Sequence, residues 1–183
     1  RIASAPDRQW ELALRIPDWA ERPSLTVNGE ELGSSPADGW WTVQREWHEG
    51  DEVVLALPLQ PRYTTADPRV DAARGAVALE YGPLVYCLEA VDNPGPRLDD
   101  ITIDTATTPE VVPGEGLLAG VATIRTTGQV RARPNSSWWP YRPTGALTAE
   151  SREPTALNAI PYYTWGNREQ GAMRVWVPTN HIT

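Results

Sequence analysis

The chain has 183 residues, enough for one large domain or for two small domains that each bury a core. Its 16 basic residues, all of them arginine, face 24 acidic ones, and the net charge of −8 argues against a nucleic-acid partner, because phosphate binding needs clustered positive charge. No run approaches the ~18 consecutive apolar residues of a membrane-spanning helix. A single cysteine cannot form an internal disulfide, which favours a reducing compartment such as the cytoplasm. The chain starts without a methionine or a signal-peptide pattern, which indicates a segment of a longer protein.

Apolar and polar residues alternate along the first half of the chain, as they do in β-strands. Residues 10–16 (WELALRI) place one apolar face on Trp10, Leu12, Leu14 and Ile16. Residues 24–32 (SLTVNGEEL) are typical of a hairpin around an Asn28-Gly29 turn. Further strands are predicted over 40–47 (WWTVQREW), 52–63 (EVVLALPLQPRY), 75–81 (GAVALEY) and 84–91 (LVYCLEAV). The prolines in the segment 52–63 confine its end to a sheet edge or a bend.

A stretch rich in turn-forming residues, 91–100 (VDNPGPRLDD), interrupts this pattern and predicts a domain boundary. Weaker strand patterns follow it, over 101–107 (ITIDTAT), 117–128 (LLAGVATIRTTG), 145–154 (GALTAESREP), 155–163 (TALNAIPYY) and 172–178 (AMRVWVP). No segment has the 3.6-residue period of an amphipathic helix. Short strands separated by turn signals roughly every 8–12 residues predict an all-β protein.

We therefore expect two small antiparallel β-sandwich domains, jelly-roll-like, over residues 1–93 and 94–178, followed by a tail over 179–183. The sequence leaves open whether the last strand, 171–178, stays in the second domain or returns to the first.

Two glutamates flank the only cysteine in the segment 80–89 (EYGPLVYCLE) and raise the question of paired-carboxylate chemistry. If strands 75–81 and 84–90 form a hairpin, Glu80 lies opposite Val85, and Glu80 and Glu89 are four rungs apart, roughly 13 Å. The carboxylates of a glycosidase lie only ~5–9.5 Å apart. The spacing therefore argues against such a pair.

Cys87 itself is more typical of a buried strand thiol than of a nucleophile. A cysteine nucleophile needs a pKa lowered by a nearby histidine, arginine or metal, and the two histidines, His48 and His181, are distant in the sequence. One cysteine and two widely spaced histidines also give no ligand pair at metal-binding spacing. We predict no catalytic residue and no metal ligand in this chain, with a thiol hydrolase built on Cys87 as a remote alternative.

The best binding candidate is the aromatic loop 136–143 (SSWWPYRP). Its aromatic and basic side chains could stack on sugar rings, or could anchor the loop on the sandwich or on a neighbouring domain. The candidate binding or docking residues are Trp138, Trp139, Tyr141 and Arg142. The nine tryptophans of the chain exceed what two small cores require, so we expect exposed rings and self-association.

Five stretches taken together resemble the C-terminal region of glycoside hydrolase family 127, the β-L-arabinofuranosidase-like proteins. They are LRIPDWA (14–20), VNG (27–29), REWHEGDEVVLALPLQPR (45–62), GAVALEYGPLVYCLE (75–89) and AIPYYTWGNREQGAMRVWVP (159–178). They occur in family order across nearly the whole chain and are weakest from about 97 to 155.

The resemblance implies an N-terminal (α/α)6 barrel followed by two β-sandwich domains. It places a cysteine nucleophile, a glutamate acid/base and a zinc ion held by cysteines and a glutamate in that barrel, so zinc is implied for the missing domain only. Cys87 matches a cysteine of the sandwich motif, and nothing catalytic carries over to this chain.

The function expected from the resemblance is a non-catalytic C-terminal region of a retaining β-L-arabinofuranosidase-like glycoside hydrolase, which supports the barrel. The implied partners are the barrel of the parent chain and, as a further option, a second copy in a homodimer. The alternative is a carbohydrate-binding module that uses loop 136–143. The sugar specificity of the parent enzyme and the oligomeric state stay open.

Overall fold

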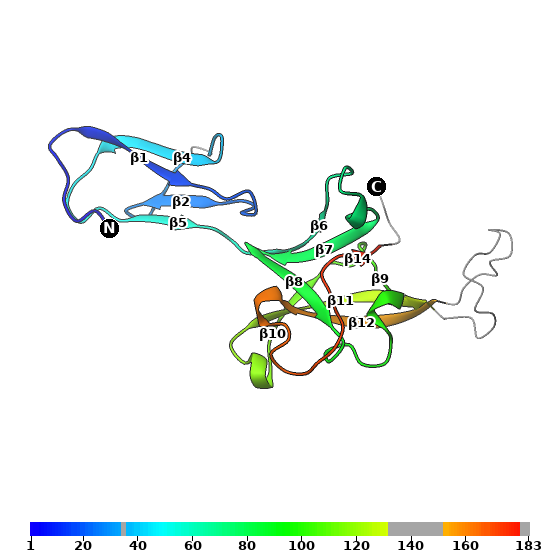
Figure 1. Cartoon of the computed structure of the whole chain (residues 1–183). Helices are drawn as coiled ribbons and strands as arrows, with labels where there is room; N and C mark the ends of the chain where they lie inside the picture. The colour runs from blue at the N-terminus through cyan, green and yellow to red at the C-terminus, as the bar shows by residue number, and fades with distance from the viewer. Residues whose placement is uncertain (34–35, 132–151, 180–183) are drawn as a thin grey trace, which may run out of the picture. The chain divides into compact units, whose positions relative to one another are not determined.

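The computed structural model describes residues 1–33, 36–131 and 152–179, which divide into two compact units, Arg1–Gln60 and Pro61–Thr183 (Figure 1). Within the described residues the regular elements are strands and short 3-10 turns. No helix in this part of the chain is long and apolar enough to cross a membrane. The predicted all-β class is confirmed.

The described part of the first unit is a sandwich of two antiparallel sheets. Its strands are β1 (Gln9–Arg15), β2 (Ser24–Val27), β3 (Glu30–Glu31), β4 (Trp40–Glu46) and β5 (Val53–Ala56). One sheet pairs β1 with β4, and the other has the order β3-β2-β5. Both sheets contribute to one core, whose buried members include Leu25, Val27, Trp41, Val43 and Trp47. The predicted apolar face of β1 packs against this core, as alternation along a half-buried strand requires.

The predicted Asn28-Gly29 hairpin is confirmed. Both residues have positive φ, 53° and 84°, which is the conformation of a two-residue turn that matches strand twist. The Asn28 Nδ2 donates to a carboxylate oxygen of Asp51 at 2.8 Å, and its Oδ1 accepts from the Glu52 amide at 2.8 Å. Hydrogen bonds from the His48 amide and from Asn28 lower the pKa of Asp51. These bonds tie the β2–β3 turn to the chain that enters β5.

The described part of the second unit contains one antiparallel sheet of nine strands. They are β6 (Pro61–Thr65), β7 (Ala76–Tyr81), β8 (Leu84–Glu89), β9 (Ile101–Ile103), β10 (Glu110–Pro113), β11 (Ala122–Arg131), β12 (Arg152–Pro161), β13 (Met173–Arg174) and β14 (Val177–Pro178). The main order is β10-β11-β12-β8-β7-β14, with β6 on β7, β9 on β11 and β13 on β8.

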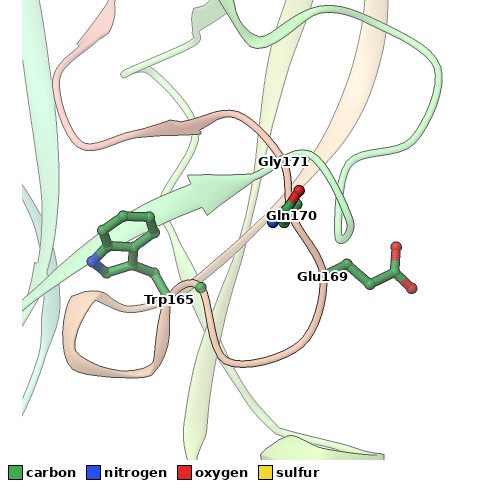
Figure 2. A pocket seen from close by; sticks show the side chains of 5 residues that line it. Trp165, Glu169, Gln170 and Gly171 are labelled. Carbon is green, nitrogen blue, oxygen red and sulfur yellow. The ribbon is translucent and has the colours of Figure 1, made fainter.

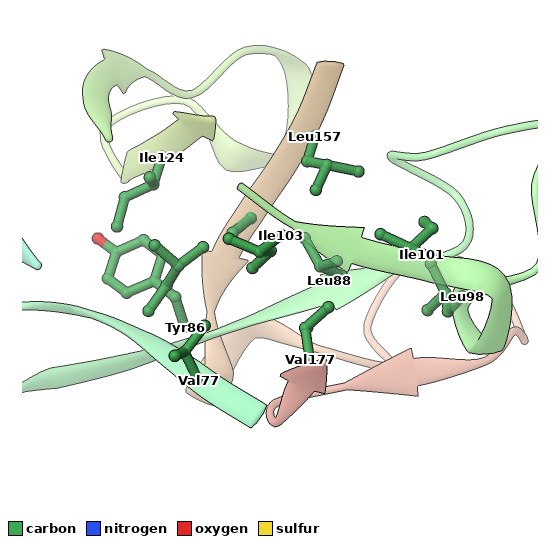
Figure 3. Packing of buried hydrophobic residues seen from close by; sticks show 11 residues of the cluster. Val77, Tyr86, Leu88, Leu98, Ile101, Ile103, Ile124, Leu157 and Val177 are labelled. Atoms are coloured by element: carbon green, nitrogen blue, oxygen red, sulfur yellow. The ribbon is translucent and has the colours of Figure 1, made fainter. Parts of the chain in front are cut away.

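This sheet curves around its own core, so that its two ends are linked through β9. Strand β9 pairs with β11, and a bridge between Ile103 and Thr179 links β9 to the residue after β14. Two walls, β7-β8-β14 and β9-β11-β12, therefore face one apolar core, and Figure 3 shows their side chains converging. The fully buried members of this core include Leu88, Ile101, Ile103, Ile124, Leu157 and Val177.

The division between the units differs from the predicted boundary at 93/94, because it lies between Gln60 and Pro61. The segment 52–63 is not one strand: its first part forms β5 in the first unit and its end begins β6 in the second. Strands β7 and β8, expected in the first domain, belong to the sheet of the second unit.

The turn-rich stretch 91–100 is a loop inside the second unit and not a linker. Asn93 in this stretch is buried, its Nδ2 donates to the carbonyls of Glu89 and Asn158, and its Oδ1 accepts from the Asn158 amide. The last strand segment also lies in the second unit, since β13 pairs with β8 and β14 with β7.

Candidate functional site

Cys87 is 2% exposed, which confirms that it is a buried strand residue. Strand β8 is covered on both faces: Tyr86 and Leu88 belong to the main core, and Cys87 packs with Leu118 and Ile160 in a second cluster. Burial raises the pKa of the Cys87 thiol to about 12, and the negative charges of Glu89 and Asp92 add to this effect. A thiol held in its protonated form and away from solvent is a poor nucleophile.

The two glutamates of the β7–β8 hairpin have separate partners. Glu80 lies opposite Val85, as the sequence predicts. Its carboxylate accepts a hydrogen bond from Thr64 Oγ1 at 2.7 Å and forms an ion pair with Arg62. Glu89 instead belongs to a cluster on the other end of β8. Each carboxylate is therefore engaged in a structural contact of its own.

The most buried charged cluster in the described residues joins Arg168 to Glu89 and Asp92. Arg168 Nη1 donates to Asp92 Oδ1 at 2.6 Å, while its Nη2 donates to Glu89 Oε2 at 2.6 Å and to the second oxygen of Asp92. The other oxygen of Glu89 accepts from the Gly166 amide at 2.8 Å. The hydrogen bond to Asp92, followed by that to Glu89, raises the pKa of Arg168 above its ordinary value.

This cluster, which we call the Arg168 frame, fixes the loop 162–171 against strands β8 and β12. The side chains of Arg168, Glu89 and Asp92 are only 14%, 6% and 16% exposed. The Asn93–Asn158 bonds described above continue the frame onto β12, and Asn158 Nδ2 also donates to the Asp92 carbonyl at 3.2 Å. Buried charges are costly unless they are paired and hydrogen-bonded, and here the bonds of Arg168 Nη1 and Nη2 join the loop to the end of β8 and the residues after it.

The loop that the frame supports presents aromatic rings to solvent. Tyr162, Tyr163 and Trp165 are 45%, 63% and 42% exposed. Beside Trp165 lies an open pocket of about 440 Å³ (Figure 2), lined by Trp165, Gly166, Glu169, Gln170 and Gly171. Figure 2 shows Trp165 on one arm of the loop and Gln170 and Gly171 on the other. The pocket thus combines an apolar wall with polar groups, as ligand and partner sites commonly do.

The binding candidates predicted from the sequence, Trp138, Trp139, Tyr141 and Arg142, lie outside the described residues. The alternative that they form a sugar-binding loop stays a prediction. No group of three or more His, Cys, Asp or Glu side chains that could hold a metal occurs within residues 1–33, 36–131 and 152–179.

Sequence reasoning missed the Arg168 frame. Arg168 lies 76 positions after Asp92 and 79 positions after Glu89 in the chain. The motif PYYTWGNR contributed only to the family resemblance and gave no sign that its arginine pairs with the end of β8.

Comparisons with known proteins agree with this architecture. A model described as "Glycoside hydrolase family 127 C-terminal domain" matches residues 61–178, and one described as "Beta-L-arabinofuranosidase, GH127 middle domain" matches residues 1–59. These matches divide the chain where the structure does. A non-reducing end β-L-arabinofuranosidase from Bifidobacterium longum subsp. longum is 37% identical over 179 residues, which are 95% of this chain and 27% of that protein.

Solved structures give the same result. The crystal structure of a GH127 β-L-arabinofuranosidase from Geobacillus stearothermophilus T6 superposes with a TM-score of 0.81 at 37% identity, covering 96% of this chain and 27% of that one. A GH127 β-arabinofuranosidase structure at 28% identity has a TM-score of 0.77 and covers 97% and 29%. The chain therefore spans less than a third of the length of these relatives. It belongs to glycoside hydrolase family 127, with the middle and C-terminal domains of that family.

Proposed function

We propose that this chain is the non-catalytic C-terminal region of a β-L-arabinofuranosidase-like glycoside hydrolase and that it supports the catalytic domain of that parent enzyme. The observation that carries the proposal is the state of Cys87, which is buried and has a pKa raised to about 12. The match to middle and C-terminal domains, over 27% of the relatives' length, supports it.

The described residues do not fit the zinc site that the family resemblance implies. Cys87 packs in an apolar cluster with Leu118 and Ile160, and the carboxylates nearest to it in the sequence, Glu89 and Asp92, are bound to Arg168. We assign no step of the reaction to this chain. Hydrolysis and metal binding are proposed for the rest of the parent enzyme.

Two measurements test this function. The purified chain should release no arabinose from a β-L-arabinofuranoside, with or without added zinc, and zinc-dependent release by rigorously purified chain would overturn the proposal. In the second measurement, the chain is added to the portion of the Geobacillus relative that lies outside the match. We expect binding and a higher melting temperature of that portion. The relative's own C-terminal portion serves as positive control, and success of that control without any effect of this chain would also contradict the proposal.

A further inference from the structure

We propose that Tyr162, Tyr163 and Trp165, which we call the aromatic turn, form the surface through which the second unit contacts the catalytic domain of the parent chain. This inference rests on the proposed function and adds the residues that carry it. The aromatic turn lies between β12 and β13, where the short 3-10 turn Tyr162–Thr164 follows the last residue of β12.

Large rings are exposed together in one short stretch of the chain. Three aromatic residues within four positions are between 42% and 63% exposed. Aromatic residues, above all Trp and Tyr, are the side chains most often responsible for binding energy at protein interfaces. Elsewhere in the described residues the exposed aromatic rings are isolated in the sequence, whereas these three lie together in one turn.

The backbone of the aromatic turn is held in place by hydrogen bonds within this chain. Thr164 Oγ1 donates to the Pro161 carbonyl at 2.7 Å, and the Trp165 amide donates to the Tyr162 carbonyl at 3.3 Å. Directly after it, the Gly166 amide donates to Glu89, and the Arg168 frame fixes the rest of the loop. A turn whose backbone is already ordered loses little backbone entropy on binding, so it is suited to act as an anchor.

The shape of the aromatic turn favours a protein partner over a sugar. The rings of Tyr162 and Trp165 are 6.2 Å apart between centroids and inclined at 35°, so the two together do not form a coplanar platform for consecutive sugar rings. The pocket beside Trp165, about 440 Å³, instead offers room for a side chain of a protein partner, with Glu169 and Gln170 at its border. Interface anchors commonly insert into pockets of this kind.

The partner that fits this surface is the remainder of the parent chain. Relatives at 37% identity are matched over only 27% of their own length, so most of such a chain lies outside the match. A domain joined to this unit in one polypeptide has a high effective concentration, and even a modest anchor would keep it docked.

The test compares two double variants in binding to the portion of the Geobacillus relative outside the match, measured by biolayer interferometry. Tyr163→Ala/Trp165→Ala removes two exposed rings of the aromatic turn. Leu117→Ala/Val70→Ala removes two side chains that are also exposed, at 83% and 49%, but lie elsewhere in the same unit. We expect at least tenfold weaker binding for the first variant and less than twofold for the second. Circular dichroism of both variants should match that of the unchanged chain.

The other outcomes distinguish failure of the interface from failure of the proposed function. Binding of the unchanged chain that survives Tyr163→Ala/Trp165→Ala, or that falls equally in both variants, overturns the interface but leaves the proposed function intact. Absence of binding by the unchanged chain, with a working positive control, overturns both. Light scattering of the chain alone and calorimetry with arabinan oligosaccharides complete the test. Self-association or sugar binding that the aromatic-turn variant abolishes would assign the surface to a second copy or to a carbohydrate instead.

Discussion

Replacing Arg168 by alanine should be among the most destabilising single changes in the second unit. The substitution removes three hydrogen bonds from the guanidinium and leaves Glu89 and Asp92 as adjacent carboxylates that are only 6% and 16% exposed. Removal of one partner from a buried ion pair costs about 3–5 kcal/mol, because the remaining charge is neither solvated nor compensated. We therefore expect the free energy of unfolding of the second unit to fall by about that amount.

Hydrogen exchange measured by mass spectrometry can observe this loss in the second unit alone. Amides of β8 and β12 should exchange faster in Arg168→Ala, while those of β1 and β4 keep their protection. Arg168→Lys should be intermediate, because an ammonium cannot donate to both carboxylates in the forked geometry of a guanidinium. Arg69→Ala is the matched control, since its ion pair with Asp67 joins side chains that are 90% and 48% exposed, and it should leave the unfolding midpoint unchanged. If Arg168→Ala were as mild as Arg69→Ala, the frame would have no structural role.

Further predictions concern packing, titration and association. Burial raises the pKa of Cys87 to about 12, whereas an unfolded thiol titrates near 9. The unfolded state therefore loses its proton first, and the free energy of unfolding should fall between pH 9 and 12 by up to about 1.4 kcal/mol per pH unit. Urea unfolding midpoints measured between pH 7 and 11 should fall less steeply with pH in Cys87→Ala, a change that itself costs about 1–2 kcal/mol at neutral pH. Equal slopes in the two proteins, or rapid labelling of the native thiol, would contradict the burial of Cys87. Gly128→Ala should lower the free energy of unfolding by about 1–3 kcal/mol through overpacking, because an added Cβ would clash with the Thr102 carbonyl oxygen and lie 2.6 Å from a methyl carbon of Leu157. The control Gly33→Ala meets no atom within 4 Å and should leave the thermal unfolding midpoint unchanged. Trp138→Ala/Trp139→Ala should weaken self-association in light scattering without changing the β signature in circular dichroism, and unchanged association would exclude these rings as the contact.

The strands could be predicted from the sequence because their signals are local. Alternation of apolar residues marks β1 and β4, and Asn28-Gly29 has the conformational freedom that a tight hairpin needs. The boundary was wrong because local signals do not say which strands pair. Residues 52–63 alternate as one strand would, yet the chain leaves one sheet at β5 and enters another at β6.

The misread stretch 91–100 shows why polar, turn-rich sequence does not by itself indicate a linker. Asn93 satisfies the backbone of β12 with its side chain, and this bond is visible only once the strands are in place. The Arg168 frame could not be predicted either, because its contacts also depend on how the strands are arranged. Its carboxylates come from β8 and the loop after it, and its arginine comes from a loop beyond β12, so that the fold alone brings them together.

The pairing of the last strands with early ones also constrains when the second unit can form during synthesis. Strands β13 and β14 are made after every strand with which they pair, and Val177 lies opposite Val77, near the start of the unit. β8 pairs with the Leu79–Tyr81 end of β7, whereas the Ala76–Val77 end pairs with β14 and lacks that partner until the last strands have left the ribosome. Pairings between such distant residues form slowly, and unpaired edges invite association with other chains. The first unit lacks this dependence, because each of its strands pairs with another within residues 1–60, and it can fold while the second is still being translated.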